Sequence, residues 1–172
     1  MMSQDSFAKL LMNENLDSFD WRILQELQLD GRLTNAELAQ RVGLSAAPCW
    51  RRVRALEDAG YITGYRAVLN RRKLGLGALA FVRLDSERNA ESATRELEAA
   101  LRERPEVVAC HYISGKGSFE LQVLCKDLDD YADFARTVLI KLPHVQDLET
   151  RFSLGEVKDQ APLNLASLQG AR

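Results

Sequence analysis

Residues 34–56, TNAELAQRVGLSAAPCWRRVRAL, constrain the fold more than any other stretch of this 172-residue chain. Apolar residues recur at helical spacing on both sides of Gly43, a residue that can adopt the left-handed conformation ending a helix. Thr34 and Glu37 have the spacing of a capping box, in which two orphan backbone N–H groups are satisfied reciprocally. The pattern therefore predicts two short amphipathic helices joined by a tight turn.

The second of these helices is expected to have one buried and one basic face. Ser45 is placed to cap it, and Pro48 falls in its first turn, where a missing N–H costs little. Cys49, Val53 and Leu56 share the face predicted to be buried. Away from that face lie Ala46, Ala47, Trp50, Arg51 and Arg54.

A helix of this kind fits the DNA major groove, and it is long enough to lie along it. Arg51 and Arg54 are expected to contact bases or phosphates, and Arg52 to reach a phosphate. Trp50 is expected to pack against the sugar–phosphate backbone or to steady the helix. Ordinary solvated surface is the alternative interpretation of these arginines. The predicted DNA-binding residues are Asn35, Ser45, Ala46, Ala47, Trp50, Arg51, Arg52 and Arg54.

Charge is distributed unevenly along the chain, although its net value is only −2. Residues 16–74 contain ten basic and seven acidic side chains, a net of +3, and the remainder carries a net of −5. A basic part joined to an acidic part favours a DNA-binding module attached to a module with another task.

The remaining composition excludes several classes of site. Cys49, Cys110 and Cys125 are widely separated, and the two histidines are His111 and His144, so neither a zinc site nor a disulfide framework is expected. Unpaired thiols favour the reducing cytoplasm, and neither a signal pattern nor a membrane span is seen. No nucleophile–base pair or phosphate loop is present, so we expect neither an enzyme nor a cofactor.

The pattern of elements predicts an N-terminal winged helix-turn-helix domain followed by a ferredoxin-like domain, an α+β fold. A third helix, capped by Asp17 and Asp20, precedes the pair described above, and a β-prone segment at 61–70 follows as a wing or linker strand. From Ala78 onward the order is β-α-β-β-α-β. The expected divisions are an N-terminal extension (1–15), the helix-turn-helix domain (16–64), a linker strand (65–77), the ferredoxin-like effector and oligomerisation domain (78–158) and a loosely ordered tail (159–172).

Such a sheet has helices on one face, so its other face must be covered. A second copy of the same sheet is the simplest cover, and we predict a dimer formed through these sheets.

The chain resembles the leucine-responsive regulator/AsnC family of transcription regulators, also called feast/famine regulators. The resemblance rests on LDSFDWRILQELQLDGRLTNAELAQRVGLS (16–45), PCWRRVRALEDAGYITGY (48–65), LPHV (142–145) and GEVK (155–158). It implies that 35–54 is the helix-turn-helix, and that the second domain dimerises and assembles further into octamers. It also implies a small effector, usually an amino acid, that binds between dimers and shifts assembly or DNA affinity.

The implied effector site falls on the turn between the two central strands, where the chain departs from the family pattern. Lys116 stands where the family usually has an acidic residue, Ser118 replaces a second acid or amide, and Phe119 replaces Tyr. A lysine favours a carboxylate rather than an ammonium group, so the ligand is altered or absent. His144 replaces the usual Gly of the Leu-Pro-Gly-Val turn. The candidate effector-binding residues are Ser114, Gly115, Lys116, Gly117, Ser118, His144 and Thr150.

Together these features predict a sequence-specific transcription regulator whose partners are operator DNA, an amino-acid-like effector and further copies of itself, with no membrane. A DNA-binding architectural protein, whose second domain only assembles it, is the alternative. That protein would bind DNA without responding to any amino acid.

Overall fold

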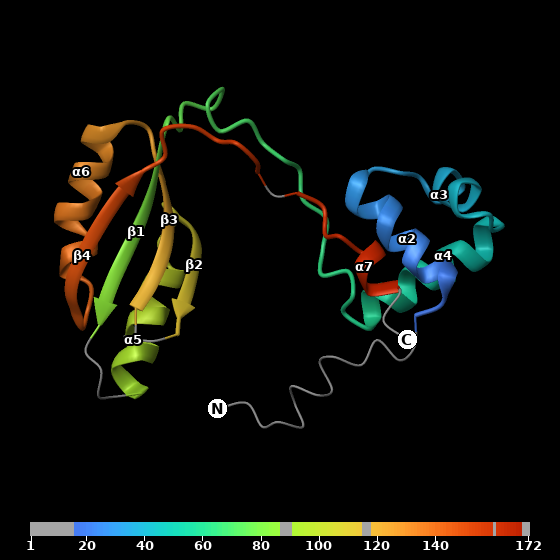
Figure 1. Ribbon diagram of the computed structural model, residues 1–172, viewed down its shortest axis with the longest axis horizontal. Coiled ribbons are helices and arrows are strands. Elements are labelled where there is room, and N and C mark those ends of the chain that lie inside the picture. The colour runs from blue at the N-terminus through green and yellow to red at the C-terminus, as the bar shows by residue number, and fades with distance from the viewer. Residues whose placement is uncertain (1–15, 87–90, 115–117, 160, 170–172) are drawn as a thin grey trace. The chain divides into compact units, whose positions relative to one another are not determined.

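The computed structural model describes residues 16–86, 91–114, 118–159 and 161–169 and divides the chain into two compact units (Figure 1). One unit comprises the described residues up to Val68 together with those from Lys158 onward. The other extends from Leu69 to Val157. The C-terminal segment, expected to be a loosely ordered tail, therefore belongs to the first unit.

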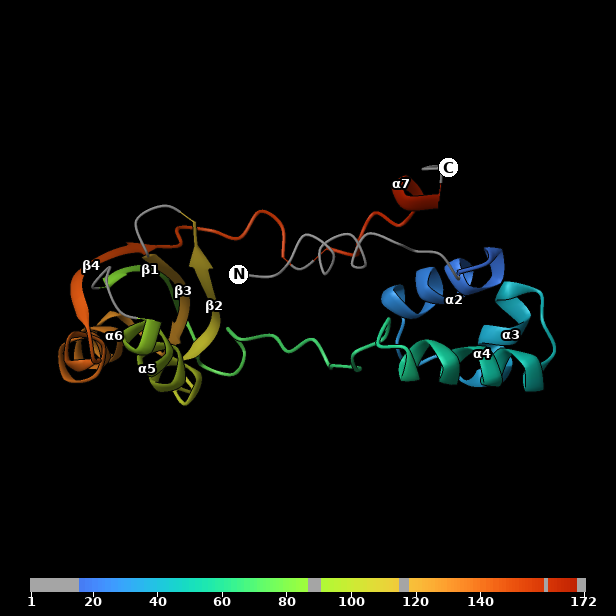
Figure 2. The same cartoon turned by 90° about the horizontal axis from the view of Figure 1, so that it is seen from below.

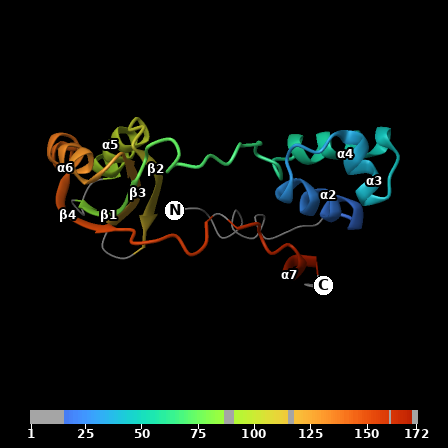
Figure 3. The same cartoon turned by 90° about the horizontal axis from the view of Figure 1, so that it is seen from above.

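Three helices form the core of the first unit: α2 (Ser18–Leu29), α3 (Asn35–Val42) and α4 (Ala46–Asp58) (Figure 3). Each is amphipathic, and their apolar faces meet in one core. The residues of this core that are almost inaccessible to solvent are Ile23, Leu38, Ala39, Val42, Cys49 and Leu56. Burial of these side chains fixes α4 against the other two helices, so its opposite face is held outward.

The helix ends follow local sequence signals. Asp17 with Asp20 and Thr34 with Glu37 form the two predicted capping boxes, and Gly43 ends α3 with a φ of 77°. Ser45 is the N-cap residue of α4, but contrary to expectation its side chain accepts no capping hydrogen bond. An N-cap side chain normally accepts from the second or third helical N–H. The third residue here is Pro48, which has no N–H to donate.

Residues 62–70 form no strand, so the predicted wing or linker strand is not observed there. A strand requires a neighbour for its backbone N–H and C=O groups. None of the described strands pairs with this segment. The β-prone composition of this segment is therefore not enough, by itself, to form a strand in the single chain.

The second unit confirms the ferredoxin-like arrangement. Its elements are β1 (Ala78–Ser86), α5 (Glu91–Arg102), β2 (Val107–Ile113), β3 (Ser118–Cys125), α6 (Leu128–Thr137), the 3₁₀ turn η1 (Leu139–Lys141) and β4 (Val145–Phe152). The strands lie in the order β2-β3-β1-β4, and every neighbouring pair is antiparallel. Helix α6 ends at Thr137 and is followed by η1.

Both helices cover the same face of the sheet (Figure 2). Alternate residues of β1, namely Ala80, Val82 and Leu84, point toward the helices and are almost fully buried. Their neighbours Phe81 and Arg83 point to the opposite face, which we call the open face, and Phe81 remains 38% exposed. This alternation is the expected pattern for a sheet with one covered face.

Candidate nucleic-acid interface and effector region

The outward side of α4 contains an open depression of about 600 Å³. It is lined by five of the predicted DNA-binding residues: Asn35, Ala46, Ala47, Trp50 and Arg51. The two alanines keep the start of the helix free of bulk, whereas Trp50 is 53% exposed despite its large apolar ring. Because the start of α4 carries only small side chains, the helix can approach closely the floor of a groove in a partner molecule.

Asn35 has a structural task that its sequence position did not indicate. Its side-chain amide Nδ2 donates a hydrogen bond of 2.8 Å to the backbone oxygen of Ala46. Because Asn35 opens α3 and Ala46 opens α4, this bond links the starts of both helices. The same amide cannot give that N–H to a base while the bond persists.

Arg51 and Arg54 differ in how they are held. Arg51 is exposed, and in the part of the chain that the structure describes it has no ion pair. The Nη1 atom of Arg54 lies 3.1 Å from the carboxylate of Glu57, and its guanidinium stacks 5.7 Å from the centre of the Trp50 ring. Arg54 also steadies Trp50 through this cation–π contact, which supports the predicted placement of both on the outer face.

Arg52 does not point outward with these residues. Its Nη1 atom lies 2.8 Å from carboxylate oxygens of both Asp17 and Asp20, and its guanidinium lies 5.5 Å from the centre of the Phe19 ring. The hydrogen bond that Arg52 donates to Asp20 is the largest contribution that raises the pKa of the guanidinium. Its charge is thus engaged within the protein, in contrast to the phosphate contact expected of it.

The contact of Arg52 with the two aspartates joins two motifs that lie far apart in the sequence. Leu16-Asp17-x-x-Asp20 and Cys49-x-x-Arg52 are distant in sequence, yet their charged members meet at the first turn of α2. Burial opposes ionisation of Asp17, but hydrogen bonds from the Asp20 and Phe19 backbones and from Arg52 outweigh it and lower the pKa of that carboxyl. These residues form one structural clamp between α2 and α4.

The candidate effector turn is only partly described, since Gly115, Lys116 and Gly117 lie outside the described residues. Ser114 directly follows β2, and Ser118 opens β3 on the open face opposite Asp85. Ser118 Oγ donates to Asp85 Oδ1, and Arg83 binds both oxygens of the same carboxylate at 3.0 and 3.2 Å. Arg83 and Asp85 were absent from the sequence prediction because only strand pairing brings them beside the turn.

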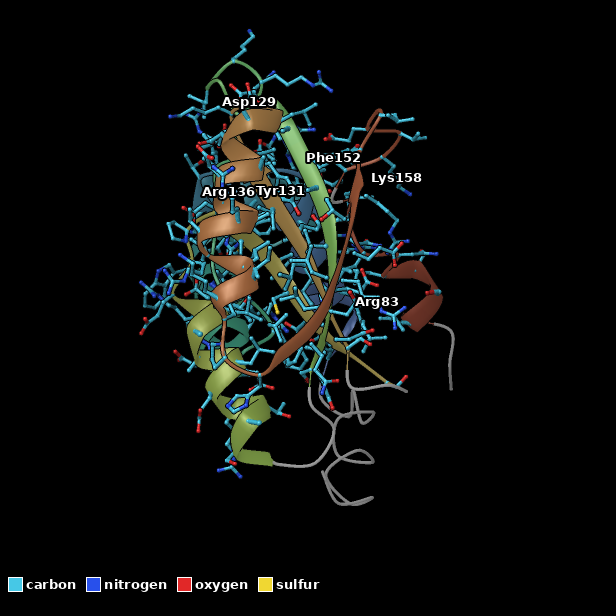
Figure 4. All side chains as sticks on the ribbon, turned by 90° about the vertical axis from the view of Figure 1, so that its left-hand side faces the viewer. Arg83, Asp129, Tyr131, Arg136, Phe152 and Lys158 are labelled. Carbon is cyan, nitrogen blue, oxygen red and sulfur yellow. The ribbon has the colours of Figure 1, made fainter. Side chains whose placement is uncertain are left out.

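The other two candidate effector residues lie elsewhere in the unit. Thr150 faces the helices and forms a hydrogen bond with Tyr131 of α6, whose ring contacts Phe152 edge-on at 5.0 Å (Figure 4). His144 Nε2 lies 3.0 Å from Glu96 of α5. The backbone of His144 has a φ of 63°, which is the left-handed conformation that a glycine at this turn would adopt freely. Within one chain, therefore, Ser118 does not share a site with Thr150.

Among the described residues, no group of three or more His, Cys, Asp or Glu side chains is arranged to hold a metal ion. No helix within those ranges is both long and apolar enough to cross a membrane.

Comparison with known proteins agrees with both units. Residues 16–63 match the model of the winged helix-turn-helix DNA-binding family, and residues 79–163 match that of the Lrp/AsnC ligand binding domain. The leucine-responsive regulatory protein of Rhizobium meliloti is 38% identical over 156 residues, which are 91% of this chain and 100% of that protein. The chain belongs to the Lrp/AsnC family of transcription regulators.

Other Lrp/AsnC proteins extend the agreement over most of the length. The leucine-responsive regulatory protein of Salmonella typhimurium is 40% identical over 88% of this chain and 92% of its own. A transcriptional regulator of Neisseria meningitidis, solved as a complex with L-Met, superposes with a TM-score of 0.84 at 40% identity. That comparison covers 90% of this chain and 99% of the other. As a member of this family the protein is a DNA-binding transcription regulator with a ligand-binding domain, not an enzyme.

Proposed function

We propose that this protein binds operator DNA through the outer face of α4 and that a small amino-acid-like effector modulates its assembly or its DNA affinity. The depression bordered by Ala46, Ala47, Trp50 and Arg51 is the observation that carries the DNA-binding part. Arg51 and Arg54 supply the exposed positive charge beside it. Ser45 and Asn35 lie at the helix starts, where a backbone or phosphate contact is reachable.

Titration of labelled operator DNA, monitored by fluorescence anisotropy, tests this assignment. Arg51→Ala and Arg54→Ala are each expected to weaken binding by about 1–3 kcal/mol. Arg136→Ala is the matched control, because Arg136 is an exposed arginine on α6, in the other unit, with a side chain that is 74% accessible. Unchanged affinity in both α4 variants would remove α4 from the interface.

The proposed effector region is the turn that joins β2 and β3, with the adjacent pair Arg83 and Asp85. The carboxylate and ammonium groups of a free amino acid would bind there in exchange for part of the Arg83–Asp85 ion pair. Lys116 adds a preference for a carboxylate. The L-Met bound to the Neisseria protein supports an amino acid as the class of effector. His144 and Thr150 lie away from this turn within one chain. They remain candidate effector contacts only in an assembly where the turn of another subunit lies beside them.

A thermal-shift screen against the twenty amino acids, with and without DNA, tests the effector proposal. A shift with one amino acid that Lys116→Ala and Ser118→Ala both abolish would support it. An unchanged melting temperature across the panel, with intact DNA binding, would favour the architectural alternative. Because DNA binding is measured separately, the two parts of the proposal can fail independently.

We further propose that the open face of the sheet forms the dimer interface and that dimers assemble into octamers. Phe81 and Ile113 are large apolar residues on this face that remain 38% and 41% exposed. Phe81→Asp should lower the mass measured by light scattering after gel filtration. Leu154→Asp is the control, since that side chain is fully exposed outside the sheet, at 101%. DNA as the partner and the unpaired thiols favour a cytoplasmic location.

A further inference from the structure

The C-terminal segment makes specific contacts with the first helix of the DNA-binding unit. The side-chain amide of Gln28 donates from Nε2 to the backbone oxygen of Leu163 at 3.1 Å. Its Oε1 atom accepts a hydrogen bond from the Leu163 N–H at 2.9 Å. Gln28 thus satisfies both backbone groups of one residue 135 positions away, as a neighbouring strand would.

Apolar burial accompanies this pairing. Leu165 is only 8% exposed, although the residues on either side of it are exposed. It faces a groove formed by α2 and residues 61–65, whose apolar lining includes Trp21, Leu24 and Leu27. The groove still encloses about 310 Å³ beside the segment. An uncovered leucine and tryptophan surface of this kind would expose apolar area to water.

The segment is also shaped internally for its position. The N–H of Leu165 donates to the oxygen of Leu163 at 2.9 Å, and that of Leu168 donates to the oxygen of Leu165 at 3.1 Å. Ser167 Oγ donates to the oxygen of Asn164 at 2.8 Å. These bonds curl the backbone into the short helix α7 (Ala166–Gln169) and direct Leu165 toward α2.

We propose that the groove between α2 and residues 61–65 is a docking surface for the chain's own segment Leu163–Leu168. In this state the segment shields Trp21 and restrains the C-terminal half of α2. It also gives the DNA-binding unit a second covalent connection to the ligand-binding unit, because residues 153–162 lead to it directly from β4. This surface is independent of the DNA contacts proposed for α4.

Trp21 provides a direct test once the second tryptophan is removed by Trp50→Phe. In that background, Leu165→Asp is expected to shift Trp21 emission to longer wavelength and to increase its quenching by iodide. Leu154→Asp is the matched control, because Leu154 is fully exposed, at 101%, and lies outside the docked segment and the groove. Equal emission and equal quenching in the two variants would overturn the proposal.

Hydrogen exchange on the full chain provides a second measurement should Leu165→Asp prevent folding. Gln28 is exposed, so Gln28→Ala should fold, and it should speed exchange of the Leu163 amide by about tenfold. Unchanged exchange at Leu163 would contradict docking. The shielding of Trp21 should also persist on dilution, whereas its loss on dilution would assign the docked segment to another copy and refute the in-chain contact.

Discussion

The guanidinium of Arg52 and the carboxylate of Asp20 lie 2.8 Å apart and tie the middle of α4 to the first turn of α2. Asp20 is also the third helical residue of α2, and its side chain completes the capping box with Asp17. One carboxylate therefore serves helix initiation and helix packing together. The orientation of α4 depends on this contact as well as on the apolar core beneath it.

Removal of this contact should lower the stability of the protein more than removal of a neighbouring exposed arginine does. Arg52→Ala is expected to lower the free energy of unfolding by about 1 kcal/mol, since both partners are partly exposed and screened. Arg51→Ala, one residue away and exposed, should leave stability unchanged. Urea unfolding followed by circular dichroism measures both variants, and equal stabilities would show that the clamp contributes nothing.

The same two arginines should behave in the opposite way toward DNA. If Arg51 neutralises a phosphate, Arg51→Ala should reduce the slope of log affinity against log salt by about 1. Arg52→Lys retains the charge of the clamp and should leave the slope unchanged. Operator titrations at several salt concentrations measure this difference, and an unaltered slope for Arg51→Ala would exclude a phosphate contact.

Acid should weaken the DNA-binding unit through Asp17. The pKa of this carboxyl is lowered in the folded state: burial opposes ionisation, but its backbone and Arg52 hydrogen bonds outweigh that effect. Its stabilising contribution is therefore present above the unfolded pKa and is lost as the pH falls through the lower, folded value. Asp17→Asn should flatten the dependence of unfolding free energy on pH below 5, and a profile identical to that of the parent protein would refute this.

His144 adopts a backbone conformation that suits glycine better. His144→Gly should raise the free energy of unfolding by about 0.5–1 kcal/mol, because relief of the left-handed strain exceeds the added freedom of the unfolded chain. His144→Asn, which tolerates this conformation, is the control for loss of the imidazole. Should His144→Gly instead lower the melting temperature, the contact with Glu96 would be the stronger effect.

The three cysteines should differ in reactivity. Burial, with help from Asp130, Glu106 and Asp127, raises the pKa of Cys125 to about 11, and Cys49 is also buried. Partial burial raises the pKa of the Cys110 thiol as well, but this cysteine alone of the three is exposed, so it should react first with a thiol reagent at pH 8. Cys110→Ser should remove the fast phase of labelling. A fast phase that survives this change would mean that a buried cysteine becomes accessible.

Elements encoded by neighbouring residues were predicted well from the sequence. The capping boxes at Asp17 and Thr34, the turn at Gly43 and the succession of strands and helices along the second unit all depend on local pattern and were confirmed. The missing cap at Ser45 has a local cause that could have been found, since Pro48 removes the donor.

Features that depend on distant residues were not predicted. Arg52 was predicted to reach a phosphate, because its helical position alone did not indicate the two aspartates more than thirty residues earlier. Arg83 and Asp85 reach the effector turn only through the pairing of β1 with β3. The leucines of the C-terminal segment show no helical or strand period that would have indicated their contact with Gln28.

The return of the chain from β4 to α2 has a consequence for how such regulators can be recombined. The ligand-binding unit lies in the sequence as an insertion, because the DNA-binding unit contributes residues before and after it. A chimaera joined at one point in the linker would carry a foreign C-terminal segment against its α2 groove. Exchange of ligand-binding units between relatives would therefore require two junctions. Gln28 and Leu165 would then come from the same parent protein.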